Sequence, residues 1–423
     1  MTTTINNEHK KLNVPNKQEK NQTCLDSAER EGLCPKGNVP NLRFPEFQGE
    51  WEKCKLVDII TFSTTRVNSS ELNKDNYVST ENMLQDYQGI VKAKSVPEDV
   101  NVVSFSCGDV LISNIRPYLK KVWKATFNGG CSSDVFVLKA NDNIESDYLH
   151  YVIANDKFIN FVMSGAKGVK MPRGDKKQME TYSLSLPQIQ EQHKIARLLS
   201  LLDERISTQN KIIEDLKKLK SAIIENVFDD KHSERLQLDN VGSYIRGLTY
   251  SSNDVVEHGG TLVMRSNNIV NGSLLDYNNN VVFVNKQMSA EQQLQNGDIV
   301  ICMANGSSSL VGKSSFYDGN WHSPITVGAF CGIYRSKEPI VKWLFQTNKY
   351  RRYIWNSLQG GNGAIANLNG EDILNMSFSI PNAPIKDTCV KMLTSVDSAL
   401  ENNMSLCALY TLQKQHLLCQ MFI

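Results

Sequence analysis

Apolar residues recur at alternating spacings of four and three over two long stretches, one near the middle of the chain and one at its end. This alternation is the seam of a coiled coil, and it predicts two long helices. Each seam is apolar at eight of its ten positions. Polar residues interrupt both seams at the same two places, Gln209 with Asn403 and Lys220 with Lys414. Shared interruptions indicate that the helices face the same kind of partner, most simply each other.

In an antiparallel pair Gln209 and Asn403 would meet near the middle, where a buried amide pair fixes the register at some cost in stability. A helix of ~40 residues is roughly 60 Å long, so the pair could act as a ruler between two sites. The plainer alternative is a helix pair that serves only as a scaffold. The seam residues assigned to the helix interface are Ile195, Leu199, Leu202, Ile206, Gln209, Ile213 and Leu216 in the first helix, and Leu393, Val396, Leu400 and Asn403 in the second.

The helices are part of a longer internal repeat. A shift of 194 residues aligns Asp203 with Asp397 across the two helices without a gap, and residues 107–112 resemble residues 296–301 at a shift of 189. Between these anchors the halves diverge. A duplicated frame with divergent inserts is expected of two modules that recognise two different sequences, and double-stranded DNA offers two half-sites at a fixed spacing. Drift after duplication, with no role in recognition, is the alternative.

The pattern of short β-like runs, a helical stretch, a Gly-rich loop and a long helix occurs twice, which predicts two globular domains. The low apolar content of the first residues predicts a flexible extension. The predicted segments are 1–36 (extension), 37–187 (first domain), 188–230 (first long helix), 231–381 (second domain) and 382–423 (second long helix).

Composition narrows the classes of function. The chain has 423 residues and a formal net charge of +1, so nucleic-acid binding must depend on local basic patches. The ten cysteines and seven histidines show no metal-binding spacing, and no catalytic cluster is evident, so we expect neither a metal site nor an enzyme. The chain has no signal peptide and no apolar run long enough to cross a bilayer, which predicts a cytoplasmic protein with no membrane partner.

Lysine and arginine gather in three segments without acidic residues, 110–133, 157–174 and 339–370. Such segments favour contact with phosphates, although basic runs are more often solvated surface. Base edges can be read by arginine, asparagine, serine or lysine, and Asn268 is equally suited to a turn. The candidate DNA-contacting residues are Arg116, Tyr118, Lys120, Lys121, Lys124, Lys167, Lys170 and Arg173 in the first half, and Arg265, Asn268, Ser308, Lys313, Arg351 and Arg352 in the second.

Seven stretches occur in a distinctive order: Asn38–Trp51, Tyr77–Met83, Ser113–Trp123, Leu186–Ile195, Leu198–Ile206, Val263–Gly272 and Asn296–Ile301. Together they resemble the DNA-specificity subunit of type I restriction–modification systems, over nearly the whole chain from about residue 37. The resemblance implies an α+β protein in which two repeated target-recognition domains are joined by two long antiparallel coiled-coil helices with pseudo-two-fold symmetry. Each domain would read one half of a bipartite DNA target.

The resemblance also implies partners. The helices and their flanks would dock two modification subunits, which bind S-adenosylmethionine and methylate adenine, and restriction subunits would join this core. The specificity subunit itself would carry no catalytic residue and no cofactor. Glu191 and Gln192 fit the family pattern at the start of the first helix and are assigned to the partner interface, whereas Ile385-Lys386 depart from it in the second copy. A coiled-coil adaptor without a DNA role, and the specificity part of a fused restriction–methylation enzyme, are the alternative functions.

Overall fold

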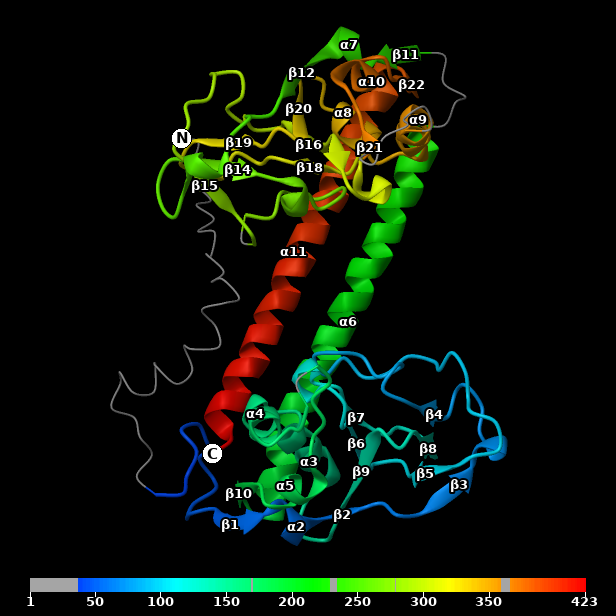
Figure 1. Ribbon diagram of the computed structural model, residues 1–423, viewed down its shortest axis with the longest axis vertical. Coiled ribbons are helices and arrows are strands. Elements are labelled where there is room, and N and C mark those ends of the chain that lie inside the picture. Colours follow the sequence, from blue (N-terminus) through cyan, green and yellow to red (C-terminus); the bar gives the residue numbers. More distant parts are fainter. Residues whose placement is uncertain (1–36, 169, 229–233, 278, 359–365) are drawn as a thin grey trace, which may run out of the picture. The chain divides into compact units, whose positions relative to one another are not determined.

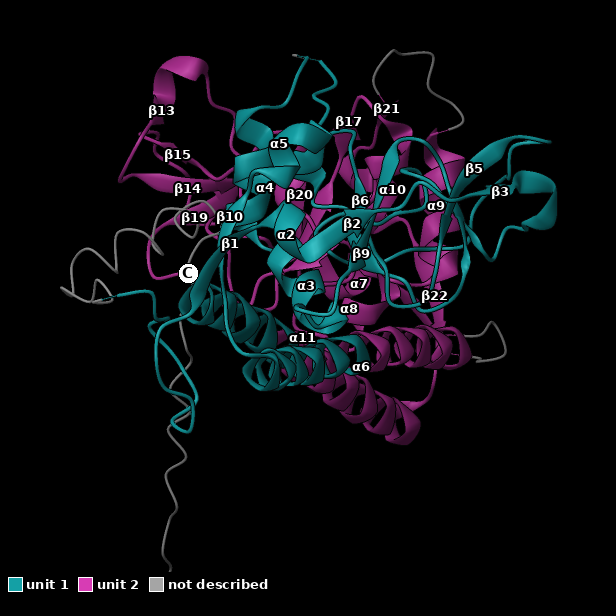
Figure 2. Cartoon of the chain, turned by 90° about the horizontal axis from the view of Figure 1, so that it is seen from below, with its two compact units in different colours: residues 1–208, 406–423 teal, residues 209–405 magenta. Residues whose placement is uncertain are grey.

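The computed structural model describes residues 37–168, 170–228, 234–277, 279–358 and 366–423 (Figure 1). The expected extension 1–36 and the second Gly-rich loop lie outside the described residues. The chain forms two compact units: unit 1 comprises residues 1–208 and 406–423, and unit 2 comprises residues 209–405. Figure 2 shows that each long helix passes from one unit into the other. The helices are therefore shared between the units and are not separate segments.

Unit 1 contains short strands, a group of helices and parts of both long helices. Its elements in chain order are β1 (Glu52–Lys55), α2 (Leu56–Ile59), β2 (Ile60–Phe62), β3 (Arg66–Asn68), η1 (Ser69–Glu71), β4 (Tyr77–Val78), β5 (Asn101–Phe105), β6 (Val110–Ser113), η2 (Pro117–Leu119), β7 (Val122–Lys124), β8 (Gly129–Cys131), β9 (Val135–Ala140), α3 (Ser146–Ile153), α4 (Asp156–Ser164), α5 (Lys176–Glu180), β10 (Ser183–Leu186) and the start of α6 (Ile189–Val227).

Unit 2 has a similar order of elements, with two additional short strands that pair with each other. Its elements are β11 (Glu234–Gln237), α7 (Leu238–Val241), β12 (Gly242–Arg246), η3 (Ser252–Asp254), β13 (Val255–Val256), β14 (Thr261–Met264), η4 (Ser266–Asn268), β15 (Val282–Val284), β16 (Ile299–Cys302), β17 (Ala304–Asn305), η5 (Ser308–Leu310), β18 (Ser314–Phe316), β19 (Ile325–Val327), β20 (Cys331–Ser336), α8 (Val341–Leu344), α9 (Asn348–Leu358), β21 (Ala366–Asn367), α10 (Gly370–Leu374), β22 (Ser377–Ile380) and the start of α11 (Ala383–Met421).

One four-stranded antiparallel sheet has the same topology in both units, with the order β2-β9-β6-β7 in unit 1 and β12-β20-β16-β18 in unit 2. The repeated Gly-Asp of the sequence forms the turn that leads into its buried strand. Gly108 and Gly297 adopt φ of 94° and 91°, which favours glycine. The next residue closes the turn, because Asp109 accepts from Ser106 N at 2.8 Å, and Asp298 accepts likewise in unit 2. The backbone conformation of this turn therefore explains why Gly-Asp occurs at the same place in both halves of the sequence.

The second four-stranded sheet differs between the units. Both units pair β3 with β5, or β13 with β15, and both contain a parallel pair, β4 with β8 or β14 with β19. In unit 1, β5 joins this pair through β8, whereas in unit 2, β15 joins it through β14. The segments that differ in sequence between the units therefore form a second sheet whose strands are paired in a different order.

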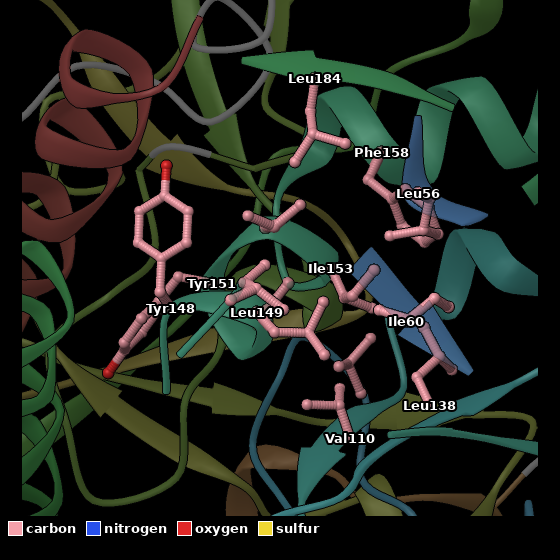
Figure 3. Packing of buried hydrophobic residues seen from close by; sticks show 14 of the residues in the cluster. Leu56, Ile60, Val110, Leu138, Tyr148, Leu149, Tyr151, Ile153, Phe158 and Leu184 are labelled. Carbon is pink, nitrogen blue, oxygen red and sulfur yellow. The ribbon is translucent and has the colours of Figure 1, made fainter. Parts of the chain in front are cut away.

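Each unit has a core that is completed by both long helices. In unit 1, the buried residues of α3 and α4 pack around the strands, as seen for Tyr148, Leu149 and Phe158 in Figure 3. Ile195 joins this core from the start of α6, and Phe422 stacks on Tyr148 with ring centroids 5.2 Å apart. In unit 2, residues from the end of α6 and the start of α11 complete the core in the same way.

The two helices are antiparallel within unit 2, and their polar seam residues find partners. Gln209 donates a hydrogen bond to Asn403, so the predicted meeting of these two amides is confirmed. Further along α6, Lys220 Nζ lies 2.6 Å from Asp397 Oδ1. Residue numbers thus fall on α11 as they rise on α6. The equivalent pair in unit 1 is Lys414 with Asp203, also at 2.6 Å.

Candidate nucleic-acid interface

The two basic segments predicted in the first half lie against each other in unit 1. The loop between β6 and β7 forms a bridge with the turn 167–173, where Ile115 pairs with Arg173. Arg116 N donates to Pro172 O at 2.7 Å, and Gly174 N donates to Asn114 O at 2.8 Å. Backbone bonds between Lys167 and Arg173 close this turn. Segments separated by about fifty residues of sequence therefore form one basic surface.

The β6–β7 loop has a tight backbone that projects an aromatic ring. Arg116 and Lys120 have φ of 49° and 53°, the left-handed region that residues other than glycine seldom occupy. They flank the 3-10 turn η2, and the Tyr118 side chain between them is 48% exposed. The Arg116 Nε atom is buried and has no hydrogen-bond partner in the described part of the chain. Strained backbone and an unsatisfied guanidinium are typical of a binding loop.

Four of the predicted phosphate-contacting side chains are held in ion pairs. Lys120 lies 2.8 Å from Asp156, Lys124 contacts Asp147, Lys167 lies 2.9 Å from Asp175, and Arg173 lies 2.9 Å from Asp134. The segments themselves contain no acidic residue, but acids at or beyond their ends fold back onto them and pair with these basic side chains. Exposed pairs of this kind contribute about 0–1 kcal/mol, so a phosphate could replace the carboxylate.

The remaining basic candidates of unit 1 have different surroundings. Lys121 Nζ donates to Thr80 O at 2.5 Å, and partial burial, followed by the charge of Arg116, lowers the pKa of this lysine. Lys170 is exposed at the tip of the 167–173 turn. Lys121 is thus anchored to the neighbouring turn, whereas Lys170 is presented to solvent.

Unit 2 has an equivalent loop between β16 and β18. Cys302 N donates to Lys313 O at 2.9 Å, as Ser113 N donates to Lys121 O at 3.0 Å in unit 1. Lys313 and Lys121 therefore occupy the same place beside the shared sheet. The loop contains η5, with an exposed Ser308, where unit 1 has η2. The candidates Ser308 and Lys313 thus correspond to the Arg116–Lys121 loop, although the two loops have no evident sequence similarity.

The other candidates of unit 2 lie on separate elements. Asn268 is fully buried, and its amide donates to Asp276 O and Asn279 O, so it has the turn role and is not available to a ligand. Arg265 is half-buried and donates to Asn280 O at 3.0 Å. Arg351 and Arg352 are exposed on α9, whose opposite face buries Tyr350 and Ile354.

Glu191 and Gln192 are buried within unit 1 and not presented to a partner. Arg43 forms two hydrogen bonds of 2.8 Å with the Glu191 carboxylate. Gln192 donates to Pro187 O and Asn143 O and accepts from Glu145 N. These residues fasten the start of α6 to its own domain.

The helix interface includes two residues that the seam pattern missed, Asp203 and Asp397. Asp397 also accepts from Lys342 Nζ at 2.8 Å and from Trp343 Nε1 at 3.3 Å, and Asp203 accepts from Tyr151 OH at 2.8 Å. Both aspartates were aligned by the repeat. An antiparallel pairing of the two repeats would have placed each one opposite the lysine of the other helix.

All nine of the remaining seam candidates are buried or partly buried on the helices. Ile195, Leu199 and Leu202 are buried in unit 1, and Ile213, Leu393 and Leu400 are buried in unit 2. Ile206, Leu216 and Val396 are half-buried. The seam pattern therefore identified apolar positions that the fold covers to different degrees.

Among the described residues, no group of three histidine, cysteine, aspartate or glutamate side chains is placed to hold a metal ion. Over the same residues, no helix has the length and apolar content needed to cross a membrane.

Comparison with known proteins identifies the family. Residues 48–218 match the domain described as "Type I restriction modification DNA specificity domain". The specificity subunit of the EcoKI type I restriction enzyme of Escherichia coli K12 is 35% identical over 155 residues, which is 34% of this chain and 31% of that protein. The StySPI specificity subunit of Salmonella potsdam is 34% identical over 153 residues, again 34% of this chain and 31% of that protein. The matched segments thus span about a third of these relatives.

A solved structure extends the comparison in three dimensions. The crystal structure of the S subunit of the type I restriction–modification system of M. genitalium aligns with a TM-score of 0.60, covering 91% of this chain and 99% of that chain. At 14% sequence identity this match concerns the fold alone. The domain match assigns residues 48–218 to the family of type I restriction–modification DNA specificity domains, and the chain shares similarity with two specificity subunits and the mixed helix-and-sheet fold of an S subunit.

Proposed function

We propose that this chain is a non-catalytic specificity subunit that binds a bipartite double-stranded DNA target, with one half-site for each recognition domain. The observation that carries the proposal is the duplicated frame with divergent loops. The shared sheet places the loop 114–121 of unit 1 and the loop 303–313 of unit 2 at the same position, with a lysine at the end of each loop. A frame kept in both units with different loops suits the reading of two different half-sites.

Phosphate contacts would come from the basic surface around the β6–β7 loop in unit 1 and from α9 in unit 2. Lys170, Arg351 and Arg352 are exposed, and Tyr118 adds an exposed ring beside the strained backbone of its loop. Basic side chains position a protein on the duplex without reading sequence. The ion-paired Lys120, Lys124, Lys167 and Arg173 would exchange their carboxylates for phosphates on binding.

The two antiparallel helices would set the spacing between the recognition domains, which would be related by pseudo-two-fold symmetry. The helices and their flanks would also bind two modification subunits, which would carry S-adenosylmethionine and methylate adenine, and restriction subunits would join them. Exposed apolar side chains on the long helices support a docking role, among them Leu201 and Ile212 on α6 and Met392, Leu409 and Leu412 on α11. Single exposed apolar residues are common on proteins, but several on one helix favour a partner.

The test is the mapping of methylated adenines in genomic DNA from cells that supply the modification subunit with and without this chain. We expect a split motif that appears only with the chain. Absence of the motif, with a modification subunit that is active beside another specificity subunit, would favour a coiled-coil adaptor without a DNA role. S-adenosylmethionine binding by the isolated chain would instead favour the specificity part of a fused enzyme.

A further inference from the structure

In each unit, one turn follows the first strand of the parallel pair, which is β4 in unit 1 and β14 in unit 2. This turn has the same construction in both units. A buried asparagine closes it from the fourth position. Asn82 Oδ1 accepts from Ser79 N at 2.6 Å in unit 1, and Asn268 Oδ1 accepts from Arg265 N at 2.9 Å in unit 2. The Asn82 amide also donates to Tyr77 O of the preceding strand and to Val91 O of the following loop. The Asn268 amide donates to Asp276 O and Asn279 O, both in the following loop. The asparagine therefore fixes the backbone in both units, and the three residues before it differ between them.

These three residues have the same pattern of exposure but different chemistry. The first two are half-buried and the third is exposed in both units. Unit 1 has Ser79-Thr80-Glu81 and unit 2 has Arg265-Ser266-Asn267. A shared scaffold that presents different hydrogen-bonding groups at matching positions is suited to reading different base pairs, because base edges are distinguished by their donors and acceptors.

Both turns adjoin the loops that carry the basic candidates. In unit 1, Lys121 Nζ donates to Thr80 O at 2.5 Å. In unit 2, Asn305 of the equivalent loop donates to Ser266 Oγ at 3.4 Å. The turn and the basic loop thus form one surface in each unit, which places the variable side chains beside groups that can bind phosphate.

The turn of unit 1 also lines a groove of about 370 Å³ that presents both polar and apolar surface. Ser79, Thr80 and Glu81 line it on one side, and Lys92 and Lys94 contribute basic groups. In unit 2, the Arg265 Nε atom is buried and lacks a hydrogen-bond partner within the described ranges. The groove beside the turn of unit 1 has room for a ligand, and the unsatisfied guanidinium at the corresponding turn of unit 2 suits a ligand that supplies a hydrogen-bond acceptor.

We propose that Ser79–Glu81 and Arg265–Asn267 are equivalent base-reading positions, one set for each half-site. The inference rests on the proposed DNA-binding function and names the residues that give it specificity. Carboxylates accept from cytosine N4, the asparagine amide pairs with adenine, and arginine pairs with guanine. Glu81 is therefore assigned to a cytosine in one half-site, and Arg265 and Asn267 to a guanine and an adenine in the other.

The test exchanges the third residue of the turn between the units. Glu81→Asn and Asn267→Glu are each made in the full chain assembled with its modification subunit, and the methylated motif is mapped for each variant. We expect each exchange to change the base preference at one position of one half-site by roughly 10- to 100-fold. All other positions of the motif should keep their preference. Asn253→Glu, the same substitution in the exposed turn η3 of unit 2, serves as the matched control and should leave the motif unchanged.

Competition binding with single-base variants of the wild-type site separates recognition from loss of fold. If either exchange weakens binding to every sequence equally, its residue does not read a base and the inference is wrong. If both exchanges leave a clear wild-type motif unaltered, the base-reading assignment fails while the proposed function stands. If the wild-type chain directs no motif at all, the proposed function itself fails.

Discussion

Removal of the Asp397 carboxylate should destabilise unit 2 far more than removal of its counterpart destabilises unit 1. Asp397 accepts from Lys220 Nζ at 2.6 Å, from Lys342 Nζ at 2.8 Å and from Trp343 Nε1 at 3.3 Å. The Lys220 and Asp397 side chains are only 10% and 12% exposed. In Asp397→Ala, the Lys220 ammonium would stay largely buried with Gly272 O as a hydrogen-bond acceptor at 3.3 Å.

The magnitude follows from this burial. Loss of one partner of a buried ion pair costs about 3–5 kcal/mol, because the other charge remains desolvated. Asp203 forms the equivalent pair with Lys414, but its side chain is 38% exposed, so water can replace it around the lysine. We therefore expect Asp203→Ala to cost about 1–2 kcal/mol, closer to the loss of an ordinary charged hydrogen bond. The two variants are matched controls for each other.

Urea unfolding at neutral pH measures the difference. Trp343 donates its indole N–H to Asp397. In a background in which the other four tryptophans are replaced by phenylalanine, its fluorescence reports on unit 2. The two units could unfold in separate transitions, and circular dichroism over the same titration would reveal this. We expect the midpoint of the tryptophan transition to fall strongly for Asp397→Ala and weakly for Asp203→Ala.

The reasoning also predicts what happens when both charges are removed. Replacing Lys220 by methionine together with Asp397 by leucine removes the desolvation cost of this pair along with its attraction, while Lys342 and the Trp343 N–H lose their acceptor in both this variant and Asp397→Ala. Such double variants are often neutral or more stable than the ion pair. We would abandon the desolvation argument if this double variant were as unstable as Asp397→Ala, or if Asp397→Ala cost no more than Asp203→Ala.

Three further predictions concern pH, register and phosphate contact. Burial, and then the charge of Lys414, lower the pKa of His150 to about 4. Because the unfolded chain binds the proton more readily, the free energy of unfolding should fall by up to about 3 kcal/mol as the pH drops from 6.5 to 4. His150→Gln should remove this dependence in thermal unfolding curves, and an unchanged slope would refute it. Gln209→Ala should leave Asn403 Oδ1 without its donor, cost about 1–3 kcal/mol and permit other registers, which light scattering and cross-linking between the helices would detect. Lys170→Ala and Arg351→Ala should each weaken binding to all DNA sequences alike and reduce the slope of log K against log salt by about 0.9, whereas a change confined to one sequence would contradict a phosphate contact.

The periodic pattern of apolar residues made the long helices predictable. Ion-pair partners that are distant in sequence could not be predicted from it. The seam located α6 and α11 because about forty residues at a constant spacing leave little ambiguity. The acid-free segments misled, because Asp134, Asp156 and Asp175 border them and fold back onto their lysines and arginine. A segment that contains no acidic residue can therefore still have acidic side chains next to it in the folded protein.

The second sheet was beyond prediction for a different reason. Several of its strands have only two or three residues, among them β4 and β13, and such strands show no alternation that could be recognised. Whether β5 pairs with β8 or β15 pairs with β14 depends on side-chain packing, which a pattern of apolar residues does not encode. Asn268 shows the same limit, since its turn role depends on carbonyls up to 11 residues away.

Under the proposed function, the division between a shared frame and residues that differ between the units would let such a protein change its target. Substitutions at exposed positions away from caps and buried networks usually alter stability by less than about 0.5 kcal/mol. Glu81 and Asn267 are exposed, whereas the asparagines that hold their turns are buried. A new base preference at these two positions should therefore cost little stability. Exchange of β5 or β15 would instead require a different sheet, so larger changes of specificity should occur by replacement of a whole domain on the common helices.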